Sequence, residues 1–301
     1  MIYCIVGPTG VGKTKLGVAL AKELNGEVIS GDSMQIYKQM DIGTAKVTEE
    51  EMDGITHHLI NVKNPDETYN VKEFQDTVRG KIEEIENKAK AVIIVGGTGL
   101  YIKAALYDYT FTDTVDDNHV DINHKYQDYS NEDLYHHLES IDKEAAKILH
   151  PNNRRRVLRA IEIYEQTGHK KSEMEASQKH LPLYDVKFIG LTLDREVLYD
   201  RINKRVDQMI SNGLEKEVTD LYNQGLTLDH QSMKAIGYKE WFNSFNHQLT
   251  LEEVVELIKK NSRNYAKRQY TWFRNQFDVT WYNVHLEDFD LTVKEVLNDI
   301  Q

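Results

Sequence analysis

Residues 2–14 read IYCIVGPTGVGKT, an apolar run that leads directly into a glycine-rich turn. Gly7 to Thr14 fit the pattern G-x-x-x-x-G-K-[ST], and a helical pattern continues from Lys13 to Leu24. A phosphate loop of this kind follows a strand, opens a helix and directs backbone N–H groups at phosphate oxygens. Lys13 adds a positive charge, and the Thr14 hydroxyl can bind Mg²⁺ or a phosphate oxygen. A chance glycine-rich turn is the alternative, and the fit of the whole motif in this context disfavours it.

Further strands and helices alternate around this loop. Short apolar runs at Glu27–Ser30, Ala91–Val95 and Asp185–Leu193 predict strands, and Phe74–Lys88 predicts an amphipathic helix. Such alternation predicts an α/β fold, with a mainly parallel, P-loop NTPase-like sheet flanked by helices. After Leu193 the pattern predicts helices to the end of the chain.

Residues 111–180 differ from the segments around them. They are polar and rich in His, Asp, Lys and Glu. Helical patterns recur there in three stretches, Asn131–Ser140, Asp142–Leu149 and Asn153–Thr167. We therefore predict a helical insertion domain at 111–180 within a core domain made of residues 1–110 and 181–301.

One carboxylate is predicted to face the phosphate loop. Asp32 follows the strand Glu27–Ser30, and ligands of open α/β sheets bind at the carboxyl ends of the strands. It could bind Mg²⁺, hold a nucleoside or accept a proton, or it could cap a helix, and the residues leave these alternatives open. Ala91–Val95 is followed by glycines and no carboxylate, which disfavours a motor or switch NTPase. Small-molecule kinases and other phosphate-handling transferases remain open.

Composition excludes several classes of protein. The chain has 301 residues, a formal net charge of −12 and one cysteine, Cys4, which excludes an internal disulfide framework and a cysteine-based zinc site. No stretch approaches the roughly 20 apolar residues of a membrane span, and the N-terminus does not read as a signal peptide. We expect a cytoplasmic protein that binds no membrane. The negative charge argues against nucleic acid as a partner, but the basic residues are concentrated in a few segments.

Each of these basic segments has two possible roles, a functional one and a structural one. The arginine-rich run 154–159 and the run 259–274, which mixes cations with aromatic residues, could bind a polyanion or form solvated helix faces over the core. Arg201 and Arg205 are spaced to share one helix face. They could clamp a pyrophosphate, or they could form surface ion pairs with nearby carboxylates, Asp194 and Asp207.

Eight stretches together resemble one protein family. In order along the chain, ending at Asn275, they are GPTGVGKT, SGDSMQIYKQMDIGTAK, THHLI, GGTGLY, RRRVLRA, RVDQMI, AIGYKE and YAKRQYTWFRN. In this combination the chain resembles the bacterial tRNA dimethylallyltransferases, also called tRNA isopentenyltransferases, of the IPP transferase family. One departure is Gly10, where many relatives carry alanine, and either residue suits the loop.

The resemblance implies an activity and its partners. It implies transfer of a dimethylallyl group from dimethylallyl pyrophosphate to N6 of adenosine 37 in tRNA, next to the anticodon, with release of pyrophosphate. It further implies that Mg²⁺ assists the transfer and that the insertion domain binds the anticodon stem-loop. We expect a monomer. A P-loop nucleoside or metabolite kinase, and a non-catalytic RNA-binding or GTP-switch module, are the alternatives.

The resemblance also implies roles for particular residues. It implies that Asp32 accepts the proton of the N6 amine, that Thr9 lies at the reaction centre and that Arg205 faces the leaving pyrophosphate. Thr14 is the implied Mg²⁺ ligand. The implied pyrophosphate-binding residues are Gly7, Pro8, Thr9, Gly10, Val11, Gly12, Lys13 and Thr14. The implied tRNA-binding residues are Asp32, Ser33, Met34, Gln35, Thr98, Arg155, Arg156, Val157, Leu158 and Arg159.

Overall fold

The computed structural model describes residues 1–111, 122–246 and 248–300. Contacts divide these residues into two compact units. The first contains residues 1–106 and 183–301, and the second contains residues 107–182.

A parallel sheet forms the centre of the first unit. Its strands are β1 (Ile2–Val6), β2 (Gly26–Ser30), β3 (His57–His58), β4 (Ala91–Val95), β5 (Val186–Thr192) and β6 (Val279–Asn283). They lie in the order β3-β2-β4-β1-β5-β6, and every neighbouring pair is parallel. The predicted α/β class is confirmed, and β1 lies between β4 and β5 because its apolar side chains are buried on both faces.

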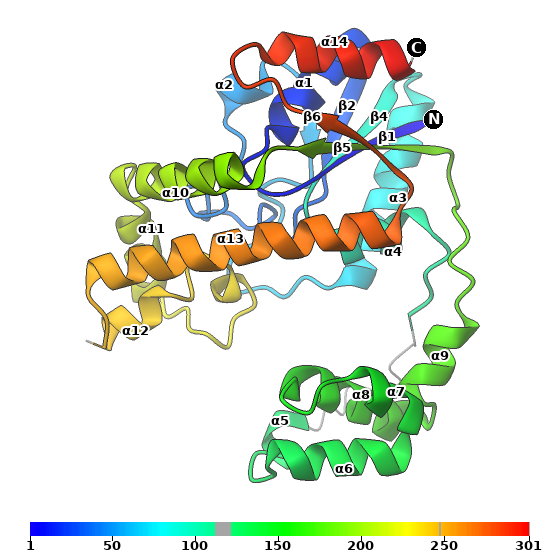
Figure 1. The fold of residues 1–301 in the computed structure, drawn as a ribbon, viewed down its shortest axis with the longest axis vertical. Helices are drawn as coiled ribbons and strands as arrows, with labels where there is room; N and C mark the ends of the chain where they lie inside the picture. The colour runs from blue at the N-terminus through cyan, green and yellow to red at the C-terminus, as the bar shows by residue number, and fades with distance from the viewer. Residues whose placement is uncertain (112–121, 247, 301) are drawn as a thin grey trace. The chain divides into compact units, whose positions relative to one another are not determined.

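Helices cover both faces of this sheet (Figure 1). The helices of the first unit are α1 (Lys13–Glu23), α2 (Glu49–Met52), α3 (Val71–Asn87), α4 (Gly99–Leu106), α10 (Arg195–Ser211), α11 (Leu214–Asn223), α12 (Trp241–Phe245), α13 (Leu251–Gln276) and α14 (Phe289–Ile300), with a short 3₁₀ turn at Ser232–Lys234. Figure 1 shows α1 beside α14, and α10 beside the long α13, and both pairs are in contact. Among the described residues, no helix is long and apolar enough to span a membrane.

The expectation of helices alone after Leu193 is wrong at Val279–Asn283. This segment, VTWYN, forms the edge strand β6. Its β-branched and aromatic residues favour a strand, and pairing with β5 satisfies its backbone on one side. Trp281 packs over Gly190 of β5, where a Cβ would collide with the indole ring. The local pattern carried this signal, but its partner strand is far away in the sequence.

The second unit is helical. Its helices are α5 (Ile122–Lys125), α6 (Asn131–Ile141), α7 (Lys143–Ile148), α8 (Arg154–Thr167) and α9 (Lys171–Ser177). The three predicted helices of the insertion are present as α6, α7 and α8, and they enclose their own apolar core. An antiparallel bridge between Tyr107 and Pro182 joins the two ends of the unit. Residues 112–121 of the predicted insertion lie outside the described residues.

Candidate active site

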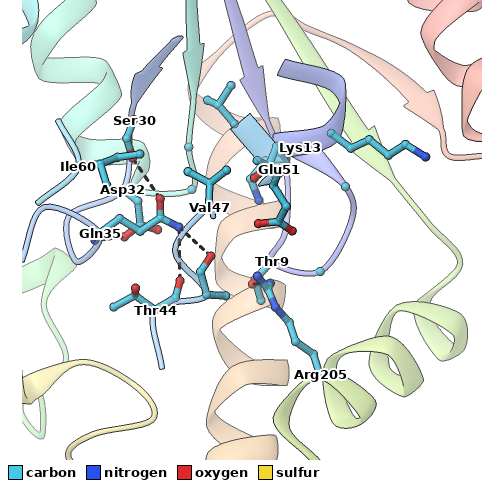
Figure 2. A pocket seen from close by; sticks show the side chains of 18 of the residues that line it. Thr9, Lys13, Ser30, Asp32, Gln35, Thr44, Val47, Glu51, Ile60 and Arg205 are labelled. Atoms are coloured by element: carbon cyan, nitrogen blue, oxygen red, sulfur yellow. Dashed lines mark hydrogen bonds between the residues drawn. The ribbon is translucent and has the colours of Figure 1, made fainter. Parts of the chain in front are cut away.

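A cavity of about 480 Å³ lies where β1, β2 and β4 end, with the phosphate loop along one side (Figure 2). Five basic side chains line it, those of Lys13, Lys15, Arg201, Lys204 and Arg205. Only two carboxylates, those of Asp32 and Glu51, line the same cavity. This excess of positive charge favours an anionic ligand.

The phosphate loop adopts a conformation that only glycine allows at several positions. Gly7, Gly10 and Gly12 have φ angles of 140°, 81° and 105°, in the left-handed region. A Cβ on Gly7 would lie 2.6 Å from the carbonyl oxygen of Leu191. The loop ends at the first turn of α1, so the unpaired N–H groups of that turn border the cavity.

The Lys13 ammonium lies against its own loop. Its Nζ donates a hydrogen bond to the carbonyl oxygen of Pro8 at 2.8 Å. Burial and the nearby Arg205 lower the pKa of Lys13 to about 7, and Asp32 opposes that shift. A bound diphosphate would favour the ammonium form.

Helix α10 contributes two arginines to the loop. Arg205 Nη1 donates to Thr9 Oγ1 at 3.1 Å, and Arg201 Nε donates to the Gly10 carbonyl oxygen at 3.1 Å. The alternative of surface ion pairs is wrong, because Asp194 accepts N–H groups at the start of α10 and Asp207 pairs with another partner, Lys259. The structure therefore brings Arg205 to the loop, beside Thr9.

The Asp32 side chain caps a turn and also lines the cavity. Its Oδ1 accepts the backbone N–H of Met34 at 2.8 Å and that of Gln35 at 3.4 Å. The residue therefore caps a turn, and no helix follows it. Among the described residues, none forms a hydrogen bond with Oδ2, and the half-buried side chain lines the cavity (Figure 2). One oxygen thus fixes the carboxylate while the other remains available to a ligand.

A second cavity of about 300 Å³ adjoins the first. It is lined by residues of the 32–34 turn, α10, α13 and the segment 234–239. The residues that line both cavities are Thr9, Asp32, Thr44, Ala45, Arg205 and Tyr265. The three residues expected to be catalytic therefore lie where the two cavities meet.

Comparisons with known proteins place the chain in a family. Residues 35–276 match the family model described as IPP transferase. A tRNA dimethylallyltransferase of Bacillus pumilus is 54% identical over 94% of this chain and 89% of its own length. Another, from Bacillus cereus strain AH187, is 55% identical over 94% and 90%.

The chain belongs to the IPP transferase family.

Solved structures of related proteins share the fold. The full-length tRNA isopentenylpyrophosphate transferase of Bacillus halodurans superimposes with a TM-score of 0.75 at 48% identity, covering 99% of this chain and 95% of that one. A eukaryotic dimethylallyltransferase described as acting on tRNA gives a TM-score of 0.85 at 32% identity, covering 98% and 77%. The likeness thus includes both units of this IPP transferase.

Sequence reasoning missed Gln269, which connects two loops of the site. This side chain on α13 is 5% exposed. Its Oε1 accepts the Thr9 N–H at 2.9 Å, and its Nε2 donates to the Gly97 carbonyl oxygen at 3.0 Å. A signal was present, since Gln269 is an uncharged residue within the basic run Lys267-Arg268-Gln269, but nothing in the sequence identified its partners.

The glycines after β4 are explained by packing. A Cβ on Gly96 would collide with the backbone of Gly31, and one on Gly97 would collide with Gln269. A Cβ on Gly99 would collide with the Trp272 ring. Tight packing therefore accounts for these glycines, and Gly96 and Gly97 also line the cavity.

The predicted tRNA-contacting residues of the core cluster beside Asp32. The Ser33 N–H donates to Thr98 Oγ1 at 3.2 Å, and Thr98 Oγ1 donates to Ser33 Oγ at 3.3 Å. Met34 lines the second cavity. Gln35 lines the first, and its Nε2 donates to the carbonyl oxygen of Ala45 at 3.2 Å. This turn is thus ordered by the loops around it.

Helix α8 of the second unit has one basic face and one apolar face. Arg155, Arg156 and Arg159 are exposed. Val157 and Leu158 belong to the core of the unit, so their side chains are not available to RNA, and this part of the prediction is corrected. Helical spacing explains the result, because these two positions are the apolar ones in the run.

The run 259–274 lies on α13, and it is only partly a basic surface. Lys267, Arg268 and Arg274 are exposed, whereas Phe273 is fully buried. Tyr265 lines both cavities. Phe273 thus anchors the helix in the core, and Lys267, Arg268 and Arg274 remain on its surface.

Proposed function

We propose that this protein transfers the dimethylallyl group of dimethylallyl pyrophosphate to N6 of adenosine 37 in tRNA. The observation that carries the proposal is the position of Thr9, Asp32 and Arg205 at the junction of the two cavities. A diphosphate in the cationic cavity and a base in the second cavity would meet there.

The residues divide the chemistry between them. As the allylic C1–O bond breaks, negative charge develops on the pyrophosphate, and Lys13, Arg205 and the loop N–H groups would stabilise it. C1 forms its new bond to N6, and the N6 proton passes to the Asp32 carboxylate. Fixing Oδ1 in the turn orients Oδ2 for that transfer. Adenine has to leave its stack to reach this junction, which requires base flipping.

The cavity also suits Mg²⁺. Mg²⁺ binds to proteins through one or two oxygens, together with substrate phosphates and waters. Thr14 and the carboxylates of Asp32 and Glu51 line the cavity and supply such oxygens, although the described residues contain no cluster of three or more His, Cys, Asp or Glu side chains suited to a metal. Bound beside Thr14, the ion would neutralise charge on the pyrophosphate.

We assign tRNA binding to both units. In the second unit, the exposed Arg155, Arg156 and Arg159 are proposed to contact the phosphates of the anticodon stem-loop. In the first, Ser33, Met34 and Thr98 border the turn at the proposed target base.

The test uses tRNA from cells that lack this modification. Labelled dimethylallyl pyrophosphate should be incorporated without ATP, and pyrophosphate should be released. Asp32→Asn should lower turnover by roughly 10²–10⁴-fold, because the amide cannot accept the proton while its oxygen can still cap the turn. Pyrophosphate affinity should stay near that of the wild type.

A matched control is Glu50→Gln, an exposed carboxylate on α2 that should leave turnover unchanged. A requirement for ATP, with phosphate moving to an acceptor, would establish the kinase alternative. Near-normal turnover of Asp32→Asn would remove Asp32 from the mechanism.

A further inference from the structure

The segment Asp41–Ala45 borders both cavities but belongs to no helix or strand. Thr44 and Ala45 line both of them at their junction. A loop in this position needs external support, because its own backbone forms few regular hydrogen bonds.

That support comes from one carboxylate on α11. Glu217 Oε2 accepts the N–H groups of Asp41 and Ile42, both at 2.8 Å. Its Oε1 accepts the Gly43 N–H at 3.0 Å. Three successive N–H groups thus converge on a single half-buried carboxylate, and charge-assisted bonds of this kind are stronger than those between neutral groups.

A buried tyrosine fixes the carboxylate from its other side. The Tyr238 hydroxyl donates to Glu217 Oε1 at 2.6 Å, and Tyr238 is fully buried. Burial and the Glu217 carboxylate hold the pKa of Tyr238 well above its ordinary value, so the hydroxyl stays a donor. A Cβ on Gly43 would lie 2.5 Å from the Tyr238 ring, so the ring packs directly against the loop.

The anchored loop in turn supports the turn that carries Asp32. The carbonyl oxygens of Thr44 and Ala45 accept Gln35 Nε2 at 3.4 and 3.2 Å. The Gln35 N–H donates to Asp32 Oδ1 at 3.4 Å. Hydrogen bonds, together with the backbone of the loop, therefore connect Glu217 through Gln35 to Asp32 (the Gln35 side-chain bonds are drawn in Figure 2).

We propose that Glu217 and Tyr238 are positioning residues that fix the loop Asp41–Ala45, and through it Gln35 and Asp32, for the transfer step. Neither residue touches the reacting groups. The inference rests on the proposed function, since the transfer reaction provides one of its readouts. It predicts that loss of the anchor lowers the rate of transfer while the phosphate loop still binds pyrophosphate.

The experiment compares Glu217→Ala, Glu217→Gln and Tyr238→Phe with the wild type. The control is Glu215→Gln, an exposed carboxylate of the same helix. Three measurements are made on each protein: kcat for transfer, pyrophosphate affinity by calorimetry, and hydrogen exchange in peptides covering residues 41–43. Unfolding in urea identifies any variant that fails to fold.

Glu217→Ala should lower kcat by about 10- to 100-fold, the range expected when a reacting group is misplaced by about 1 Å. Exchange at the loop should accelerate. Pyrophosphate affinity should change less than about twofold, because the phosphate loop is held by Gln269, Arg201 and Arg205 and not by this segment. Glu217→Gln, which retains one acceptor oxygen, should restore part of the rate. Tyr238→Phe should have a smaller effect, since it leaves the three N–H bonds in place.

Two outcomes would overturn the inference. One is a folded Glu217→Ala protein with accelerated loop exchange and normal kcat, and the other is an equal loss of kcat and pyrophosphate affinity. Failure of the wild type to transfer the prenyl group would instead refute the proposed function, and loop exchange would still report whether Glu217 anchors the segment.

Discussion

Replacing Gln269 with leucine should destabilise the first unit and disturb the phosphate loop. Gln269 lies almost fully buried on α13, between the Thr9 N–H and the Gly97 carbonyl oxygen. Leucine has a similar volume but forms neither bond. Both backbone groups would then lose their hydrogen-bond partner at the edge of the cavity.

The size of the effect follows from the two lost bonds. Leaving a buried donor or acceptor unpaired costs about 1–3 kcal/mol, so the two groups together cost roughly 2–6 kcal/mol. Leucine recovers roughly 1 kcal/mol through apolar burial, and the exposed edge of the cavity admits some water. We therefore expect a loss of about 1–5 kcal/mol in the free energy of unfolding.

Urea denaturation followed by tryptophan fluorescence measures this loss. Trp241, Trp272 and Trp281 all belong to the first unit, so the signal reports that unit alone. The control is Gln276→Leu, at the exposed end of the same helix, which should change stability by less than about 0.5 kcal/mol. A Gln269→Leu protein as stable as this control would show that the Thr9 N–H does not depend on Gln269.

Three further predictions test charge at the site, in the second unit and in the core. Burial and Arg205 lower the pKa of Lys13 to about 7, so the free protein loses this ammonium above that pH. Pyrophosphate affinity measured by calorimetry should fall up to about tenfold per pH unit above neutrality in the wild type, and less in Lys13→Met. Arg155→Ala with Arg159→Ala should weaken tRNA binding and reduce the slope of log affinity against log salt by roughly 1–2, whereas Lys143→Ala, at an exposed position of α7, should not. Burial raises the pKa of Glu27, but hydrogen bonds from two lysines and a histidine outweigh it and hold the value at about 2. Since the pKa is depressed, its contribution of roughly 3 kcal/mol is present above the unfolded pKa near 4 and is lost towards pH 2. The stability difference between wild type and Glu27→Gln should therefore shrink between pH 6 and pH 3.

Local sequence was sufficient to predict the helices, strands and loops whose formation depends on residues close to them in the chain. The strand β1, the glycine loop and α1 follow one another, and each restricts the next, so the motif predicts all three. Three helices of the second unit, α6, α7 and α8, were predicted for the same reason, whereas the short α5 and α9 were not. Ser130 and Asp142 cap α6 and α7 through bonds to residues three positions along.

The sequence alone did not predict features that depend on distant partners. Strand β6 forms because β5 lies beside it, although more than eighty residues separate them. Gln269 forms a hydrogen bond with the backbone of Thr9, 260 residues away in the sequence. Glu217 forms one with the backbone of Asp41, 176 residues away. Backbone N–H and C=O groups are the same at every residue, so no residue type at the other end marks such a pair.

The loop after β4 carries glycines at a position where a hydrolysing NTPase has a metal-binding carboxylate. In a hydrolysing NTPase, a carboxylate at such a strand end helps to hold Mg²⁺. Here Gly96 packs against Gly31. The Gly97 carbonyl oxygen accepts a hydrogen bond from Gln269 Nε2, and Gln269 Oε1 accepts one from the Thr9 N–H. A side chain at Gly96 would collide with the Gly31 backbone, and one at Gly97 would displace the Gln269 amide. In the proposed reaction, carbon is transferred and both phosphates leave together, so no bond between phosphates has to break. The position after β4 can then serve to fix Thr9, and the charge on the departing pyrophosphate is met by the cations of the loop and α10.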